Sequence, residues 1–258
     1  MKKTLTCIIP VYNDSGNLQK AVYSALNQEE CEKVVIVDDA SSDNTLEVAR
    51  EIAAKESRVE VFPLPFNKGQ AFARNIGAVI ANTHYIAFLD ADDEHCDGFY
   101  KLALEALGNY PKASWVRGAI EYVGELTNDS FEKDDDRLNQ SMFANPNNLV
   151  MRKHIFNQIG GFPCSKEFRG KYGGEDIALN HILNTYFEGM LTKSFALRYS
   201  VRSGGAFHKY ISRTKWENGQ IVILESDADA DMFVKAFEEH VEDRKYCLGQ
   251  GLASIKTE

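Results

Sequence analysis

Short apolar runs alternate with segments of helical apolar spacing through the first half of the 258-residue chain, and this alternation constrains the fold more than any other feature. Continuously apolar strands are typical of parallel sheets, because helices bury both faces of each strand. A parallel connection also needs a crossover, usually a helix, between successive strands. The sequence therefore predicts an α/β fold with strands at about residues 6–11, 33–39, 59–62, 84–90 and 114–123.

The helices between these strands are predicted from apolar residues three or four positions apart. They are marked by residues 18–26, by residues 46–53, by Phe72, Ile76, Val79 and Ile80, and by residues 99–107. The second half of the chain is less regular. We expect a polar, acidic loop at 125–139, helices around 153–159, from Asp176 and after Asp229, and a strand over about 192–201.

The charge and cysteine content exclude several classes of protein. Acidic residues outnumber basic ones by 38 to 29, the net charge is −9 and we find no basic patch, so nucleic-acid binding is not expected. The five cysteines are odd in number and form no CxxC pair or zinc-type spacing. No apolar run reaches the roughly 18 residues of a membrane span. Together these features predict a reduced, cytoplasmic, globular protein.

Acidic side chains follow two of the predicted strands directly. Asp38 and Asp39 end the second strand, and Asp90, Asp92 and Asp93 end the fourth. Parallel strands place their carboxyl ends at one edge of the sheet, where open α/β sheets bind ligands. Like charges that converge there repel one another unless a cation or hydrogen-bond donors lie among them. Oxygen ligands suit a hard divalent cation, which predicts a site for Mg²⁺ or Mn²⁺.

A third acidic pair, Glu175-Asp176, follows Gly173-Gly174 and opens a predicted helix. Acidic residues in a first helical turn also interact favourably with the helix dipole. Taken alone, the pair is therefore compatible with a structural role or a chemical one.

Five motifs occur along the chain in an order that resembles the family 2 glycosyltransferases of the GT-A fold, from Leu5 to about Tyr199. They are IIPVYN at 8–13, VDDASSDNT at 37–45, NKGQAFARNIG at 67–77, FLDADDE with its D-x-D at 88–94, and IGGFP at 159–163 followed by GGEDIAL at 173–179. The second motif has Ala40 where the family usually has glycine.

The resemblance implies a Rossmann-like, mostly parallel sheet flanked by helices, with a less regular C-terminal extension on the acceptor side. It divides the chain into a nucleotide-sugar-binding half at 1–124, an acceptor-side half of the same catalytic domain at 125–225 and a helical tail at 226–258.

The resemblance also implies nucleotide-binding roles. It assigns the wall of the base pocket to Pro10, Val11 and Tyr12, and the acceptor of a base imide N–H to Asp39, which favours a uridine nucleotide. It places Asn67, Gly69 and Arg74 along the nucleotide and its phosphates, and Asp90 with Ala91 of the D-x-D at the ribose or sugar. A salt bridge from Arg74 to Asp38 or Asp39 is the structural alternative.

Metal and catalytic roles follow from the same resemblance. It implies that Asp92 binds Mn²⁺ or Mg²⁺ at the diphosphate, that His208 is a candidate further ligand, and that Arg198 and Arg202 are candidates to face the diphosphate. It assigns the base that deprotonates the acceptor hydroxyl to the Glu-Asp pair. We select Asp176 as the base and Glu175 as the residue that positions hydroxyl groups; the reverse assignment stays open.

The function implied is an inverting, metal-dependent transfer of a sugar from a nucleotide-diphospho-sugar, with UDP-sugar expected, to a glycan or lipid-linked acceptor in cell-surface polysaccharide synthesis. Peripheral association with the inner face of the membrane is an option for such a protein. A non-catalytic nucleotide-sugar-binding or scaffold protein of the same fold is one alternative. A phosphotransfer protein that uses Asp90 is another, but it leaves the motifs at 67–77 and 173–179 unexplained.

Overall fold

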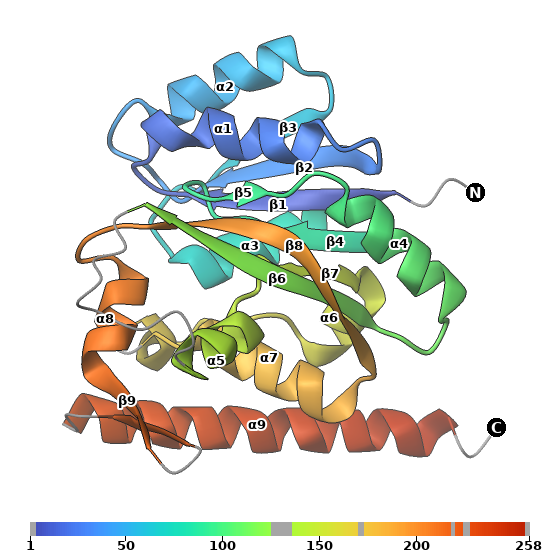
Figure 1. Ribbon diagram of the computed structural model, residues 1–258, viewed down its shortest axis with the longest axis vertical. Coiled ribbons are helices and arrows are strands. Elements are labelled where there is room, and N and C mark those ends of the chain that lie inside the picture. The colour runs from blue at the N-terminus through green and yellow to red at the C-terminus, as the bar shows by residue number, and fades with distance from the viewer. Residues whose placement is uncertain (1–3, 125–135, 170–172, 218–219, 224–227, 256–258) are drawn as a thin grey trace.

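The computed structural model describes residues 4–124, 136–169, 173–217, 220–223 and 228–255, and within them the chain is organised around one mixed sheet (Figure 1). The strand order is β3-β2-β1-β4-β7-β6-β8-β5. The strands are β1 (Leu5–Val11), β2 (Cys31–Asp38), β3 (Val59–Pro63), β4 (Tyr85–Phe88), β5 (Glu94–His95), β6 (Trp115–Gly124), β7 (Leu149–Arg152) and β8 (Gly189–Val201).

Most neighbouring strands run parallel, as the alternating pattern predicts. The strand β1 pairs in parallel with β2 and β4, β2 with β3, and β6 with β8. The exceptions are β7, which is antiparallel to both β4 and β6, and β5, which is antiparallel to β8. Because β7 and β8 come from the second half of the chain, both halves contribute to the same sheet.

Helices cover both faces of the sheet. They are α1 (Ser15–Leu26), α2 (Thr45–Lys55), α3 (Gln70–Ile80), α4 (Phe99–Asn109), α5 (Asp136–Ala144), α6 (Lys153–Ile159), α7 (Glu175–Tyr186), α8 (Ala206–Arg213) and α9 (Ala228–Ile255), with a 3₁₀ turn at Lys166–Arg169 and a hairpin of β9 (Thr214–Glu217) and β10 (Gln220–Ile223). The long helix α9 lies along the edge of the molecule, beyond α7 (Figure 1).

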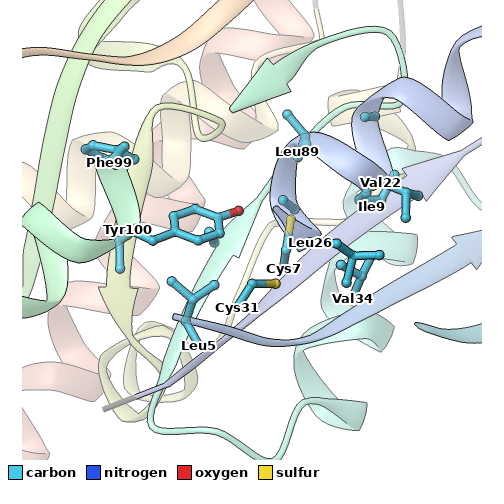
Figure 2. Packing of buried hydrophobic residues seen from close by; sticks show 14 of the residues in the cluster. Leu5, Cys7, Ile9, Val22, Leu26, Cys31, Val34, Leu89, Phe99 and Tyr100 are labelled. Carbon is cyan, nitrogen blue, oxygen red and sulfur yellow. The ribbon is translucent and has the colours of Figure 1, made fainter. Parts of the chain in front are cut away.

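The two faces of β1 show how the core divides. Cys7 and Ile9 point to one face, where they join residues of α1, α2 and α4; Figure 2 shows them with Val22 and Tyr100 from two of these helices. Ile8 points to the other face and packs against α3, in a cluster that also contains residues of α6 and α7. This alternation follows from the two-residue period of a strand, and burial of both faces explains the continuously apolar strands.

Part of the expected acidic loop is helical. Residues 136–139 belong to α5, whereas 125–135 lie outside the described residues. The expectation of a loop was wrong for 136–139, because tertiary contacts that cannot be predicted from the polar sequence stabilise α5. Arg117 donates hydrogen bonds to the carbonyl oxygens of Met142 and Asn145 at the end of the helix. Among the described residues, no helix has the length and apolar character needed to cross a membrane.

Candidate active site

A pocket of about 290 Å³ lies at the carboxyl edge of the sheet. Eight residues considered from the sequence line it: Pro10, Val11, Tyr12, Asp39, Asp90, Ala91, Asp92 and Arg202. All but Arg202 lie at or just after the ends of β1, β2 and β4, whose carboxyl ends meet because these strands are parallel. The other lining residues are Asp14, Gln70, Tyr199, Ser200, Gly205 and Phe207. The pocket is thus built from the first half of the chain and closed by the segment that joins β8 to α8.

Asp39 connects the pocket to the loop before α3. Its carboxylate accepts hydrogen bonds from the backbone N–H groups of Lys68 and Gly69, both at 2.7 Å, and its carbonyl accepts one from Asn67 Nδ2 at 3.2 Å. The residues Asn67 and Gly69 therefore support Asp39 and are not among the lining residues. A carboxylate oxygen can accept more than one hydrogen bond, so Asp39 retains capacity to accept one from a ligand.

Arg74 joins the D-x-D motif to the Glu-Asp pair. Its side chain is 2% exposed, and its Nη2 lies 2.5 Å from Asp90 Oδ1 while its Nη1 lies 3.7 Å from Glu175 Oε1. These carboxylates replace Asp38 and Asp39, the salt-bridge partners considered from the sequence. Gln70, one turn earlier on α3, donates from Nε2 to the same Glu175 oxygen at 2.5 Å. The carboxylate of Glu175 is therefore held from two positions on α3.

Asp92 is the predicted metal ligand, and an arginine contacts it. Arg202 Nη2 lies 3.2 Å from Asp92 Oδ2 and 3.3 Å from Asp14 Oδ2, so one cation bridges two carboxylates across the pocket. Burial and the nearby Asp90 raise the pKa of Asp92. Asp93 points away to accept the Ser200 N–H at 2.8 Å, and burial raises its pKa well above the usual value.

The described residues contain no cluster of three or more His, Cys, Asp or Glu side chains placed to hold a metal ion. His208 lies on α8, its Nε2 is buried without a hydrogen-bond partner in the described structure, and it is not among the lining residues of the pocket. Arg198 pairs instead with Glu121, at 3.0 Å, and with Glu94, at 3.9 Å. Of the two arginines considered from the sequence, Arg202 is the one that lines the pocket.

Glu175 and Asp176 begin α7 and differ in their surroundings. Gly174 precedes them at a φ of 91°, and a Cβ on it would lie 2.5 Å from the ring of Phe233 on α9, so this position requires glycine. Asp176 is partly exposed, and its Oδ1 accepts a hydrogen bond from the N–H of Ile177 at 2.8 Å. Burial and the adjacent Glu175 raise the pKa of Asp176 to about 7, against the opposing effect of Arg74.

Sequence reasoning missed several lining residues. Asp14 directly follows the first motif and Gln70 lies inside the third, so inspection of motif flanks could have found both. No sequence motif contains the remaining four, which are Tyr199, Ser200, Gly205 and Phe207. Their place in the pocket depends on the path of β8 and α8, so the sequence pattern could not reveal it.

Comparisons with known proteins agree with this architecture. A family profile described as glycosyl transferase family 2 matches residues 6–163. An uncharacterized glycosyltransferase of Haemophilus influenzae is 41% identical over 90 residues, which cover 34% of this chain and 36% of that protein. The chondroitin synthase of Pasteurella multocida is 42% identical over 86 residues, which cover 33% of this chain and 9% of that protein. The chain thus spans well under two-thirds of the length of either relative.

The structure of S. aureus TarS in complex with UDP-GlcNAc superposes with a TM-score of 0.66 and 17% identity, over 96% of this chain and 71% of that one. At this identity the likeness shows a shared GT-A fold.

Proposed function

Because the chain belongs to glycosyltransferase family 2, we propose that it transfers a sugar from a nucleotide-diphospho-sugar to a hydroxyl group with inversion at the anomeric carbon. The observation that carries the proposal is the separation of two acidic groups. Asp39, Asp90 and Asp92 line the pocket. Glu175 and Asp176 begin α7, and Arg74 connects the two groups because it contacts both Asp90 and Glu175. In this proposal the donor and the acceptor each have carboxylates of their own, and Arg74 connects the two sets.

The donor we propose is a UDP-sugar. Pro10, Val11 and Tyr12 supply an apolar wall for the base, and Asp39 supplies an acceptor for an imide N–H, which uracil has and cytosine lacks. Binding of UDP-GlcNAc by TarS, a protein of the same fold, agrees with a uridine donor. Thymidine carries the same N–H and is the second candidate.

We propose Asp92 as the ligand of Mn²⁺ or Mg²⁺, because hard divalent cations prefer oxygen ligands and this partly exposed carboxylate lines the pocket. Asp92 would hold the ion together with diphosphate oxygens, and His208 is the candidate further ligand. The ion would neutralise charge that develops on the leaving diphosphate. Arg202 lines the same pocket and would face the diphosphate.

Asp176 is the base in this proposal. Glu175 is held by Gln70 and Arg74, whereas the hydrogen bond described for the Asp176 carboxylate comes from its own helical turn. Asp176 takes the proton of the acceptor hydroxyl while the oxygen attacks the anomeric carbon. The bond from that carbon to the diphosphate breaks, and the nucleoside diphosphate leaves. Because burial and Glu175 raise the pKa of Asp176 to about 7, transfer should decline as the pH falls below about 7.

The acceptor we propose is a glycan or lipid-linked hydroxyl used in cell-surface polysaccharide synthesis, by analogy with the chondroitin synthase relative. Residues 1–124 would bind the donor, 125–225 the acceptor side, and 226–258 would form the helical tail. The protein would act in the cytoplasm or at the inner face of the membrane. The phosphotransfer alternative is weakened because Asp90 is already paired with a buried guanidinium at 2.5 Å.

The test is turnover by Asp176→Asn and Glu175→Gln, both nearly isosteric, across UDP-, TDP-, GDP- and CDP-sugars with a panel of glycan acceptors. We expect Asp176→Asn to bind UDP normally and lose about 10² to 10⁴ in transfer rate, as removal of a general base typically does. Near-normal turnover by Asp176→Asn with loss in Glu175→Gln would reverse the two roles. No turnover of any sugar by the unaltered protein, with UDP still bound, would favour the non-catalytic alternative.

A further inference from the structure

Arg117 on β6 is a buried cation that the proposed chemistry does not use. Its side chain is 1% exposed, and its hydrogen bonds go to neutral oxygens. Nη1 donates to the carbonyl oxygens of Met142, at 2.9 Å, and Asn145, at 2.6 Å, and to Asn148 Oδ1 at 2.7 Å. Nη2 donates to Asn180 Oδ1 on α7. Within the described residues, no carboxylate forms an ion pair with it.

A buried charge without a counter-ion costs several kcal/mol, so an apolar residue at position 117 would give a more stable core. The cost is visible in the pKa of Arg117, which burial lowers to about 9. Part of the charge is compensated by carbonyls at the C-terminal end of α5, the negative end of the helix dipole. The guanidinium therefore serves to bind several segments at one point.

Asn180 connects Arg117 to the start of α7. Its Nδ2 donates to the carbonyl oxygen of Asp176 at 2.9 Å and to that of Ala144 at 2.6 Å. One side chain thus accepts from Arg117 on the sheet and donates to both α5 and the first turn of α7. The backbone of Asp176 is joined to β6 by two consecutive hydrogen bonds.

We propose that Arg117 and Asn180 are positioning residues that hold the first turn of α7 against the sheet and so aim the Asp176 carboxylate at the acceptor. This inference rests on the proposed role of Asp176 as the base. A misplacement of about 1 Å at a reacting group can cost about 10²-fold in rate, which is the effect such an anchor prevents.

The charged groups that face the Asp176 carboxylate are Glu175 on its own helix and Arg74 on α3. Neither is a partner of Arg117 or Asn180, so a change at Asn180 removes no hydrogen bond or ion pair of either group. A negative charge at residue 180 would lie one helical turn from Asp176 and should raise the pH at which Asp176 loses its proton.

The decisive variant is Asn180→Asp, with Asn148→Asp as its matched control. Both asparagines are buried and accept from Arg117, and each donates from Nδ2 to two carbonyl oxygens, those of Gly118 and Met142 in the case of Asn148. Both variants therefore place the same charge beside the same guanidinium and lose the same number of donated bonds. They differ in that residue 148 makes none of these bonds to α7.

Turnover is measured from pH 5.5 to 9 with the UDP-sugar that gives the highest UDP release in the donor panel. We expect Asn180→Asp to lower kcat about 10- to 100-fold and to move the acidic limb of the kcat/KM profile to higher pH, with UDP affinity unchanged by calorimetry. Asn148→Asp should keep the acidic limb of the unaltered protein. Equal limbs and equal kcat in the two variants would overturn the inference.

If Asn180→Asp does not fold, as judged by circular dichroism and UDP-induced thermal stabilisation, Asn180→Ser replaces it, because serine removes the bonds without adding a charge. Asn180→Ser should then lower kcat with UDP affinity retained; kcat equal to that of the unaltered protein would overturn the inference. Asp176→Asn distinguishes a failure of the base assignment from a failure of the positioning role. Full turnover by Asp176→Asn defeats the assignment of the base and, with it, the positioning role. Loss of turnover in Asp176→Asn, with Asn180→Asp matching its control, defeats the positioning role alone.

Discussion

At the residue scale, Ala40 has a φ of 60° at the position where the family's motif usually has glycine. A side chain in this left-handed region costs roughly 1–2 kcal/mol, whereas glycine occupies it freely. Ala40 lies between the strand β2 and the helix α2. The chain therefore carries local strain beside the pocket residue Asp39, and this strain can be measured.

Ala40→Gly should raise the free energy of unfolding by about 0.5–1 kcal/mol, because the relief of strain exceeds the added entropy of the unfolded chain. Urea unfolding measures the change. Ala106→Gly, within α4, is the control and should lower the same quantity by about 0.5–1 kcal/mol. A loss of stability in both variants would contradict strain at Ala40.

Asp92 is the second test at this scale. Asp92→Asn removes the charge that pairs with Arg202 and that would bind a metal ion. We expect Mn²⁺-dependent UDP binding, measured by calorimetry, to weaken at least about tenfold, and EDTA to abolish transfer by the unaltered protein. Asp97→Asn, an exposed acid before α4, should leave both measurements unchanged. Full transfer by metal-free enzyme in EDTA would falsify the proposed metal dependence.

At the scale of elements, the two-residue strand β5 is fixed by a buried histidine. His95 Nδ1 lies 2.5 Å from Tyr100 Oη on α4, and His95 Nε2 lies 2.8 Å from the carbonyl oxygen of Asn147, before β7. The backbone N–H of His95 also donates to Ser24 Oγ on α1 at 3.0 Å. A strand too short to be stable by pairing alone is thereby joined to three other parts of the chain.

Burial lowers the pKa of His95 from 6.5 to about 4, which makes stability dependent on pH. Because the unfolded chain binds this proton more readily, the contribution is complete above pH 6.5 and is lost as the pH falls toward 4, by up to about 3 kcal/mol. We expect the stability difference between the unaltered protein and His95→Gln to shrink between pH 7 and pH 5. The exposed His84→Gln should follow the unaltered protein. A difference that is constant with pH would contradict a neutral buried His95.

At the scale of the whole molecule, the pocket needs both halves of the chain. Nine of its lining residues, from Pro10 to Asp92, come from the first half of the chain, and the other five, from Tyr199 to Phe207, come from the second half. Both sets are attached to one sheet, because β7 and β8 continue the order that β1 and β4 begin. A ligand that contacts both sets should therefore stabilise the molecule as a unit.

UDP with Mn²⁺ should raise the unfolding temperature, by the equivalent of about 2.7 kcal/mol at a hundredfold excess over its dissociation constant. TDP should follow UDP because it offers the same imide N–H to Asp39, and CDP should have little effect. Thermal unfolding with UDP, TDP, GDP and CDP, each with and without Mn²⁺, measures the order of the stabilising effects. A clear preference for GDP or CDP would refute the uridine assignment.

The comparison of α3 with its sequence shows where local pattern stops being informative. The residues Phe72, Ile76, Val79 and Ile80 correctly predict a helix, yet Val79 is 76% exposed. The helix instead buries small residues and Arg74, because Gly77 lies so close to β1 that a Cβ on it would be 2.3 Å from Ile8 Cγ2. Helical spacing marks an amphipathic segment, but the partner surface decides which residues become buried.

Sequence by itself was sufficient for the α/β fold with a mostly parallel sheet, the helices with strong apolar spacing, and the convergence of Asp39, Asp90 and Asp92 at one edge, because each depends on local periodicity or on the direction of a strand. Only the tertiary structure decided that β7 inserts antiparallel between β4 and β6, that Arg74 joins Asp90 to Glu175, and that Asn180 links Arg117 to Asp176. Gln70 and Glu175 are 105 positions apart and touch. The meeting of such distant side chains depends on how whole elements pack, and no periodicity within a single segment contains that information.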